Sequence, residues 1–183
     1  MKKVLVTGGT GLVGSAIKDI NLTKSEKLYD FIYVSSSNVN LLDYNSTFNY
    51  FSEIKPDIII HLAANVGGLY KNMAQPVDML EHNLAINSNV LKVAHELGVK
   101  KLIACLSTCI FPDKVSYPID ETVLHDGPPH PSNAPYAYAK RLLEVQTRSY
   151  SSQFGYNYVC IIPTNIYGPN DNFNLADSHV IPG

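Results

Sequence analysis

The stretch VLVTGGTGLVGSAI, residues 4–17, places four glycines between an apolar run and a segment of helical character, and three of them are regularly spaced. Gly8, Gly11 and Gly14 form the pattern GxxGxxG directly after that run. Glycine permits a tight turn and lets a pyrophosphate approach the backbone, while a helix N-terminus offers free N–H donors and the positive end of its dipole. The stretch therefore predicts a dinucleotide site, against the alternative of a glycine-rich turn that binds nothing.

Apolar runs of strand length recur along the chain with helical segments between them. We expect strands at 3–7, 31–35, 57–63, 101–107 and 158–164, and helices at 11–20, 46–54, 76–97 and 135–153. Runs that are apolar on both faces are typical of buried parallel strands. The alternation predicts an α/β fold with a doubly wound parallel sheet of the Rossmann type, which binds ligands at the carboxyl ends of its strands.

The composition fits one globular domain. The 183 residues are 45% hydrophobic and 16% charged with a net charge of −2, so the chain lacks the basic excess of proteins that bind nucleic acid or anionic lipid. Its cysteines, Cys105, Cys109 and Cys160, form no CxxC pair, which indicates neither a disulfide framework nor a metal site. The first apolar run is too short for a signal peptide or a membrane span. We expect a soluble protein of the cytoplasm.

The end of the second strand distinguishes between nicotinamide cofactors. An acidic residue there would bind the adenosine ribose hydroxyls and repel a 2′-phosphate. The segment YVSSSNVNLLD, residues 33–43, instead has Ser35 and Ser36, with no acid before Asp43. This favours NADP, because hydroxyl groups can donate hydrogen bonds to phosphate oxygens. Asp43 has two interpretations, a contact to the adenine edge or the N-terminal cap of the next helix.

A tyrosine and a lysine stand four residues apart at the start of the last predicted helix. In PYAYAKRLLE, Tyr136 and Lys140 would point from one helix face. A lysine ammonium beside a phenol lowers the phenol pKa and makes it a usable general acid or base. Ser107, at the end of the fourth strand, could hydrogen-bond the substrate oxygen that the tyrosine protonates.

These features together resemble the extended short-chain dehydrogenase/reductase family. The glycine turn, a strand-end serine and Tyr-x-x-x-Lys occur in that order, and HLAANVGG (61–68) and PTNIYGP (163–169) look like the family's cofactor- and substrate-facing loops. The resemblance covers essentially the whole chain. It implies NADP contacts from Gly8, Thr10, Gly11, Leu12, Val13, Gly14, Ser35, Ser36, Asp43, Leu62, Ala63, Ala64, Leu106, Tyr136, Lys140, Pro163, Thr164, Asn165, Ile166 and His179.

Within that family, the closer resemblance is to the members that epimerise and then reduce GDP-4-keto-6-deoxy-D-mannose. It is carried by STCIFPD (107–113), YAYAKR (136–141), PTNIYGPND (163–171) and SHVIPG (178–183). It implies that Cys109 is the base and His179 the acid for inversion at C3 and C5. It further implies hydride transfer from NADPH to C4, with Tyr136 as the proton donor, Ser107 on the C4 oxygen and Lys140 on the nicotinamide ribose. The substrate contacts implied are Ser107, Thr108, Cys109 and Asn165.

Two alternatives stay open. The chain could be another nucleotide-sugar reductase or epimerase of the same fold, in which Cys109 only packs, or a non-catalytic NADP-binding module. The resemblance also implies a homodimer through the helices at 76–97 and 135–153. Since family members continue well beyond residue 183, we expect residues 1–183 to form the NADP-binding domain with the catalytic residues, and the substrate-binding domain to be largely absent.

Overall fold

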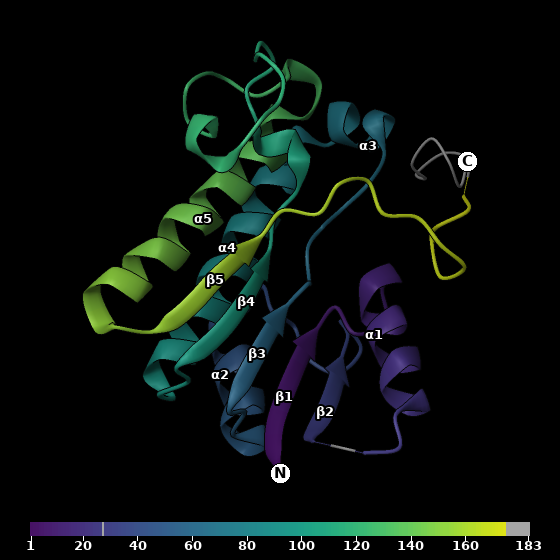
Figure 1. Cartoon of the computed structure of the whole chain (residues 1–183), viewed down its shortest axis with the longest axis vertical. Helices are drawn as coiled ribbons and strands as arrows, with labels where there is room; N and C mark the ends of the chain where they lie inside the picture. Colours follow the sequence, from purple (N-terminus) through teal and green to yellow (C-terminus); the bar gives the residue numbers. More distant parts are fainter. Residues whose placement is uncertain (27, 175–183) are drawn as a thin grey trace.

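A five-stranded parallel sheet forms the centre of the molecule. The computed structural model describes residues 1–26 and 28–174. Its strands are β1 (Lys2–Thr7), β2 (Tyr29–Val34), β3 (Ile58–His61), β4 (Lys101–Cys105) and β5 (Asn157–Ile161). They pair in the order β2-β1-β3-β4-β5, and every pairing is parallel (Figure 1). The α/β fold predicted from the sequence is confirmed.

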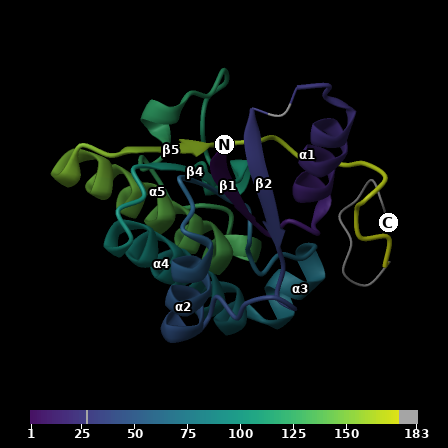
Figure 2. The same cartoon turned by 90° about the horizontal axis from the view of Figure 1, so that it is seen from below.

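Helices cover both faces of the sheet, but unequally. Helix α1 (Leu12–Thr23) lies on one face, whereas α2 (Tyr44–Ile54), α4 (Pro76–Glu96) and α5 (Ala134–Phe154) lie on the other (Figure 2). The short helix α3 (Leu69–Ala74) lies beyond the carboxyl ends of the strands (Figure 1). Three single 3₁₀ turns follow β4, at Thr108–Ile110, Glu121–Val123 and Pro131–Asn133.

The direction of winding reverses beside β1. The chain passes from β1 to its neighbour β2 and then returns across β1 to β3, after which β4 and β5 extend the same edge. The loops that leave β1 and β3 therefore diverge and open a crevice at the carboxyl ends of these strands. In open α/β sheets this is where ligands bind.

Three strands end two or three residues earlier than the apolar runs suggested. β3 ends at His61, β4 at Cys105 and β5 at Ile161, whereas the runs continue to residues 63, 107 and 164. The extra residues leave the sheet and enter the loops at its carboxyl edge. Most of them are apolar and all of them line a cavity at this edge, and periodicity alone does not separate such residues from a strand.

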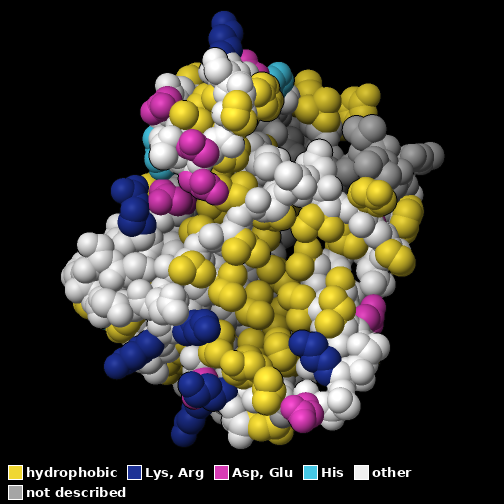
Figure 3. Space-filling view, viewed as in Figure 1, with side chains coloured by type: hydrophobic (Ala, Val, Ile, Leu, Met, Phe, Trp, Pro, Cys, Tyr) yellow, Lys and Arg dark blue, Asp and Glu magenta, His cyan; other side chains and the backbone are white. Residues whose placement is uncertain are grey.

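The main core lies between the sheet and the helices α2, α4 and α5. Its fully buried side chains come from both layers and include Leu5, Phe51, Ile59, Val90, Leu91, Leu102 and Leu143. Burying each contributes roughly 1.5–3 kcal/mol. On β5, Val159 and Ile161 are exposed. A broad apolar area lies over the strands on the face shown in Figure 3. Among the helices of the described residues, none is long and apolar enough to cross a membrane.

Candidate active site

The glycine turn after β1 is packed so closely that side chains cannot be accommodated. Gly8 has φ +69°, and a Cβ there would lie 2.8 Å from the backbone nitrogen of Ala63. A Cβ on Gly14 would lie 2.5 Å from the Gly8 carbonyl oxygen. Helix α1 begins at Leu12 without a side-chain cap on its first turn. The turn thus presents close backbone and free N–H donors to the crevice, as a pyrophosphate requires.

A buried series of hydrogen bonds through Thr7, His61 and Asn87 lies next to this turn. The Oγ1 of Thr7 lies 2.8 Å from Nδ1 of His61, and the His61 Nε2 lies 3.0 Å from Oδ1 of Asn87. The backbone N–H of Ala63 also donates to Thr7 Oγ1 at 3.3 Å. Burial, together with the Lys140 charge, lowers the pKa of His61 to about 3, so its ring is neutral. These contacts fix β1, β3 and α4 to one another directly behind the glycine turn.

The loop that follows β3 is held by a second polar network. The backbone N–H of Asn65 donates to Oδ1 of Asn83 at 2.9 Å, and the Asn83 amide donates back to the Asn65 carbonyl at 2.9 Å. The Asn72 amide donates to the carbonyl of Gly67 at 2.9 Å. The loop is thereby fixed against α3 and α4, with Ala63 and Ala64 facing the cavity.

The end of β2 carries the two serines that were expected to favour NADP. Ser35 and Ser36 both line the cavity. Asp43 is the N-terminal cap of α2, and its carboxylate accepts a 2.6 Å hydrogen bond from the backbone N–H of Ser46. Of its two interpretations the structure shows the helix cap, and Asp43 is not among the residues that line the cavity. Asn40, Leu41 and Leu42 line it instead.

Ser107, Cys109, Tyr136 and Lys140 come together at the end of β4. Ser107 precedes the 3₁₀ turn Thr108–Ile110, which places Thr108 and Cys109 on the cavity wall. Lys140 is 2% exposed, and its Nζ donates a 2.8 Å hydrogen bond to the Cys105 carbonyl. That nitrogen lies 5.8 Å from the centre of the Tyr136 ring. Two pairs of residues that are at least 27 positions apart in sequence thus share one wall.

The electrostatics of Tyr136 differ from the expectation. The sequence predicted that Lys140 would lower the pKa of Tyr136, but burial raises it well above its usual range, and neighbouring Cys109 and Cys105 act in the same direction. Lys140 is itself buried, which lowers its pKa, and its ammonium hydrogen-bonds the Cys105 carbonyl. The Tyr136 phenol is therefore held protonated and suits the role of a proton donor.

Cys109 is a partly buried free thiol. Burial raises its pKa, while the Ser107 hydroxyl and the charges of Lys140 and Arg141 lower it. Burial is the largest of these effects, so the pKa of Cys109 stays above its usual value, and the two cations offset only part of the rise. Cys105 and Cys160 are also free, and burial raises the pKa of each.

One large cavity joins these groups. Its volume is about 1780 Å³. Typical pockets for single small ligands occupy about 300–1,000 Å³, so there is room for a dinucleotide and a second ligand. Apart from Asp43, every predicted site residue in the described ranges lines this cavity, including Thr10, Val13, Leu62, Leu106, Pro163, Thr164, Asn165 and Ile166. His179 lies outside the described residues.

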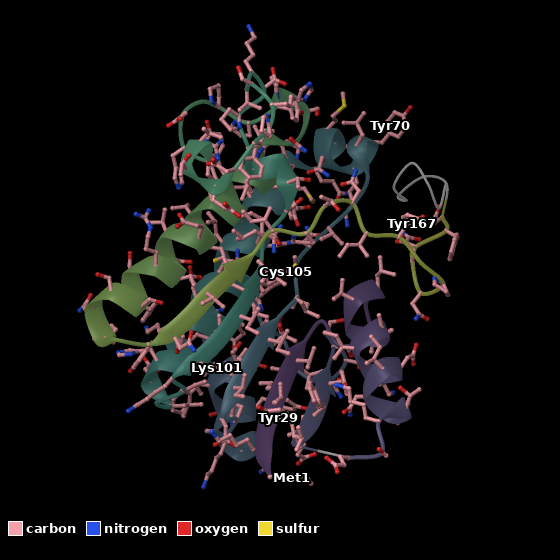
Figure 4. The ribbon with its side chains drawn as sticks, viewed as in Figure 1. Met1, Tyr29, Tyr70, Lys101, Cys105 and Tyr167 are labelled. Atoms are coloured by element: carbon pink, nitrogen blue, oxygen red, sulfur yellow. The ribbon has the colours of Figure 1, made fainter. Side chains whose placement is uncertain are left out.

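The sequence did not single out several residues that line the cavity. Tyr70 on α3 and Cys105 at the end of β4 were not predicted, whereas Tyr167 after β5 lies in the loop PTNIYGP that the resemblance indicated; Figure 4 labels these three. Phe111 and Tyr117, from the long loop before α5, also contribute. The available signal was an aromatic residue in a polar surrounding of the sequence, and both Tyr70 and Tyr117 are exposed in the structure. In the described ranges, no group of three or more His, Cys, Asp or Glu could hold a metal ion.

Comparisons with known proteins identify the family of the chain. A model of the NAD dependent epimerase/dehydratase family matches residues 4–183. The chain is 54% identical over all its residues to a probable GDP-L-fucose synthase of Drosophila melanogaster, and 52% identical to a GDP-L-fucose synthase of Dictyostelium discoideum. A GDP-L-fucose synthetase structure from Naegleria fowleri, bound to NADP, superposes on 99% of the chain with TM-score 0.90 and 45% identity. The chain spans 57% of each of the two curated relatives and 59% of the Naegleria chain.

Proposed function

Because the chain belongs to the NAD dependent epimerase/dehydratase family, we propose that it epimerises GDP-4-keto-6-deoxy-D-mannose at C3 and C5 and reduces it at C4 with NADPH, giving GDP-L-fucose. One observation carries the proposal: Ser107, Cys109, Tyr136 and Lys140 line the same cavity as the glycine turn. The names of the relatives, GDP-L-fucose synthase and synthetase, support it.

The residues at the crevice fit NADP. The close backbone at Gly8 and Gly14 and the uncapped start of α1 suit the pyrophosphate. Ser35 and Ser36 suit the 2′-phosphate, because no carboxylate lines the cavity at this position to repel it. The Naegleria structure contains NADP, which supports the same choice. When bound, NADPH supplies the hydride for C4.

The reduction uses three side chains of the wall. The Ser107 hydroxyl donates a hydrogen bond to the C4 oxygen and holds it beside the phenol. Tyr136, which burial keeps protonated, gives its proton to that oxygen as the C4 carbon gains the hydride. Lys140 binds the nicotinamide ribose and fixes the end of β4 through the Cys105 carbonyl.

The epimerisation uses the thiol of Cys109. A proton next to the C4 ketone leaves C3 or C5 for the Cys109 thiolate, the electron pair moves onto the C4 oxygen, and Ser107 stabilises that negative charge. A proton returned on the opposite face inverts the centre, and we assign this acid to His179. Thr108 and Asn165, which line the cavity, contact the sugar.

Isotope exchange tests this function. With substrate and NADPH in deuterated water, the proposed reaction places solvent deuterium at C3 and C5 and hydride from NADPH at C4. Cys109→Ser should lose the deuterium at both carbons. Cys160→Ser is the matched control, because Cys160 does not line the cavity, and it should behave as the unaltered chain. NADPH oxidation without deuterium at C3 or C5 would instead support a simple C4 reductase, and NADPH binding without reaction would support a non-catalytic module.

The remaining features of the proposal concern assembly. We propose that residues 1–183 form the NADP-binding and catalytic part, and that the portion of the relatives outside the match supplies most contacts to GDP. This agrees with the 57% of the Drosophila relative that is matched. We also propose a homodimer through α4 and α5, since Tyr138 and Leu142 form an exposed apolar pair one turn apart on α5. The free cysteines support a cytoplasmic location.

A further inference from the structure

Two consecutive basic residues of α5 hold the segment that carries Ser107 and Cys109. Lys140 donates to the carbonyl of Cys105, where β4 ends. Arg141 donates from Nε to the carbonyl of Ile110, at 2.6 Å, where the 3₁₀ turn ends. The two contacts lie five residues apart along the chain and bracket the residues between them. The segment is therefore fixed to α5 at both ends.

Arg141 is in an unusual environment for a charged side chain. It is 7% exposed, and among the described residues its Nη2 has no hydrogen-bond acceptor. Its guanidinium also lies 5.6 Å from the centre of the Tyr138 ring. Burying a cation with an unsatisfied donor costs free energy. Folding alone does not account for it, because an apolar side chain of similar volume would avoid that cost.

Arg141 does not reach the ligand space. It is absent from the cavity lining, whereas the adjacent Lys140 is part of it. Its contacts instead point to the turn Thr108–Ile110, and its charge acts on Cys109. An effect on the reaction would therefore pass through Cys109 and not through direct contact with substrate.

We propose that Arg141 is a positioning residue, which fixes the turn Thr108–Ile110 so that the Cys109 thiol enters the cavity from one defined position. This rests on the proposed function, in which Cys109 is the base. Burial raises the pKa of the Cys109 thiol, and the positive charge of Arg141 acts in the opposite direction by stabilising the Cys109 thiolate. The other charged or titratable groups that act with Cys109 are Lys140 and Tyr136, both on α5.

The test measures Cys109 directly, without substrate. Iodoacetamide alkylates the thiolate, and peptide mass spectrometry separates Cys109 from Cys105 and Cys160, whose rates serve as internal references. Arg141→Met removes the charge and the donor at similar volume, whereas Arg141→Lys retains the charge. Arg148→Met is the matched control, because Arg148 is an exposed arginine of the same helix whose partner is Glu144.

The expected result is a selective effect at Cys109. Near neutral pH, Arg141→Met should slow Cys109 alkylation about threefold to tenfold, which corresponds to a rise of half to one unit in the pKa of the thiol. Arg141→Lys should recover part of the rate, and Arg148→Met should have none of these effects. Hydrogen exchange of the Ile110 and Phe111 amides, which donate to Ser107 and Thr108, should quicken in Arg141→Met.

A folded Arg141→Met chain with an unchanged alkylation profile and unchanged exchange in the turn would overturn the proposal. If Arg141→Met does not fold, Arg141→Lys decides alone, because loss of the 2.6 Å contact must then quicken exchange in the turn. The proposed function can fail separately. A selective alkylation effect without deuterium exchange into substrate would leave Arg141 positioning a thiol that is not the epimerase base.

Discussion

The Nζ of Lys140 donates a 2.8 Å hydrogen bond to the backbone carbonyl of Cys105, and so ties α5 to the last residue of β4. Tyr136 lies one helical turn before Lys140, and Ser107 lies two residues after Cys105. The contact therefore fixes the position of Tyr136 relative to Ser107. The two groups that share the C4 oxygen in the proposed reduction therefore owe their relative position to one buried lysine.

Replacing Lys140 should damage reduction more than folding. In Lys140→Met we expect the rate of NADPH oxidation in a single turnover to fall by about 10² to 10⁴, since Tyr136 loses its alignment and the ribose its ligand. The free energy of unfolding should fall by about 1–3 kcal/mol, because the Cys105 carbonyl loses its buried donor. Lys92→Met, at an exposed lysine of α4, is the control and should retain the rate. A Lys140→Met chain that reduces substrate at the normal rate would refute this role.

The raised pKa of Tyr136 makes a prediction about pH. The phenol must be protonated to donate, and burial moves its pKa above the usual value of about 10, so the protonated form persists to higher pH. The rate of the reductive step should therefore show no decline from Tyr136 ionisation between about pH 7 and 9. Single-turnover NADPH oxidation across this range measures it, with Tyr136→Phe as the inactive reference. A Tyr136-dependent decline with a midpoint near pH 8 would show that Lys140 lowers the phenol pKa after all.

His61 should make the fold sensitive to acid. Its pKa is lowered to about 3 in the folded chain by burial, whereas the unfolded value is 6.5. The unfolded chain thus binds the extra proton between these values, so the stabilisation is complete above the unfolded pKa and is lost as pH falls toward the folded one. The contribution to the slope is at most about 1.4 kcal/mol per pH unit.

Urea unfolding of the unaltered chain and of His61→Gln at pH 7, 6, 5 and 4 measures this slope. His61→Gln should be less stable at pH 7 but should lose stability less steeply on acidification. His125→Gln, at an exposed histidine beside Glu144, is the matched control. Equal slopes for His61→Gln and the unaltered chain would show that His61 does not carry the effect.

The serines at the end of β2 predict a change in cofactor choice. Ser36 lines the cavity where the 2′-phosphate of NADP is proposed to lie. Ser36→Asp should weaken NADPH binding by about tenfold or more and spare NADH, because a carboxylate repels the phosphate. Ser36→Asn has similar size without the charge and should change the preference little. Titrations of each variant with NADPH and with NADH measure the two affinities. Equal weakening of NADPH and NADH binding by Ser36→Asp would show that the 2′-phosphate does not lie at Ser36.

Local patterns were sufficient for the sheet and the glycine turn and indicated Ser107, Tyr136 and Lys140, whereas Cys109 was implied by the family resemblance. Each pattern rests on short-range features, such as apolar runs and a four-residue helical spacing, that the fold then brings to one edge. The pKa of Tyr136 was predicted in the wrong direction, because Lys140 bonds a carbonyl 35 residues away and burial outweighs its charge. Neither the hydrogen bond between Lys140 and Cys105 nor the burial of Tyr136 can be predicted from neighbouring residues in the sequence.

Tyr70 and Tyr117, which also line the cavity, could not be predicted from the sequence for a related reason. Helix α3 is six residues long, which is too short for a periodic pattern of apolar residues. A hydrogen bond from the Asn72 amide to the Gly67 carbonyl holds it, and no apolar stripe marks it in the sequence. Tyr117 reaches the cavity from a polar loop whose path depends on tertiary contacts. Asp43 illustrates the opposite case, since its position before a helix made a cap one of its two expected roles.

The central claim is that Cys109 and Tyr136 act on one sugar in one cavity. The most direct measurement is NADPH consumption and product formation with GDP-4-keto-6-deoxy-D-mannose, for this chain and for a fusion in which the unmatched portion of the Drosophila relative follows residue 183. The account predicts that the fusion forms GDP-L-fucose, and that Cys109→Ser in the fusion forms none while still binding NADPH. Undiminished GDP-L-fucose formation by the Cys109→Ser fusion, or a folded fusion that binds NADPH and never consumes it with this sugar, would contradict the account.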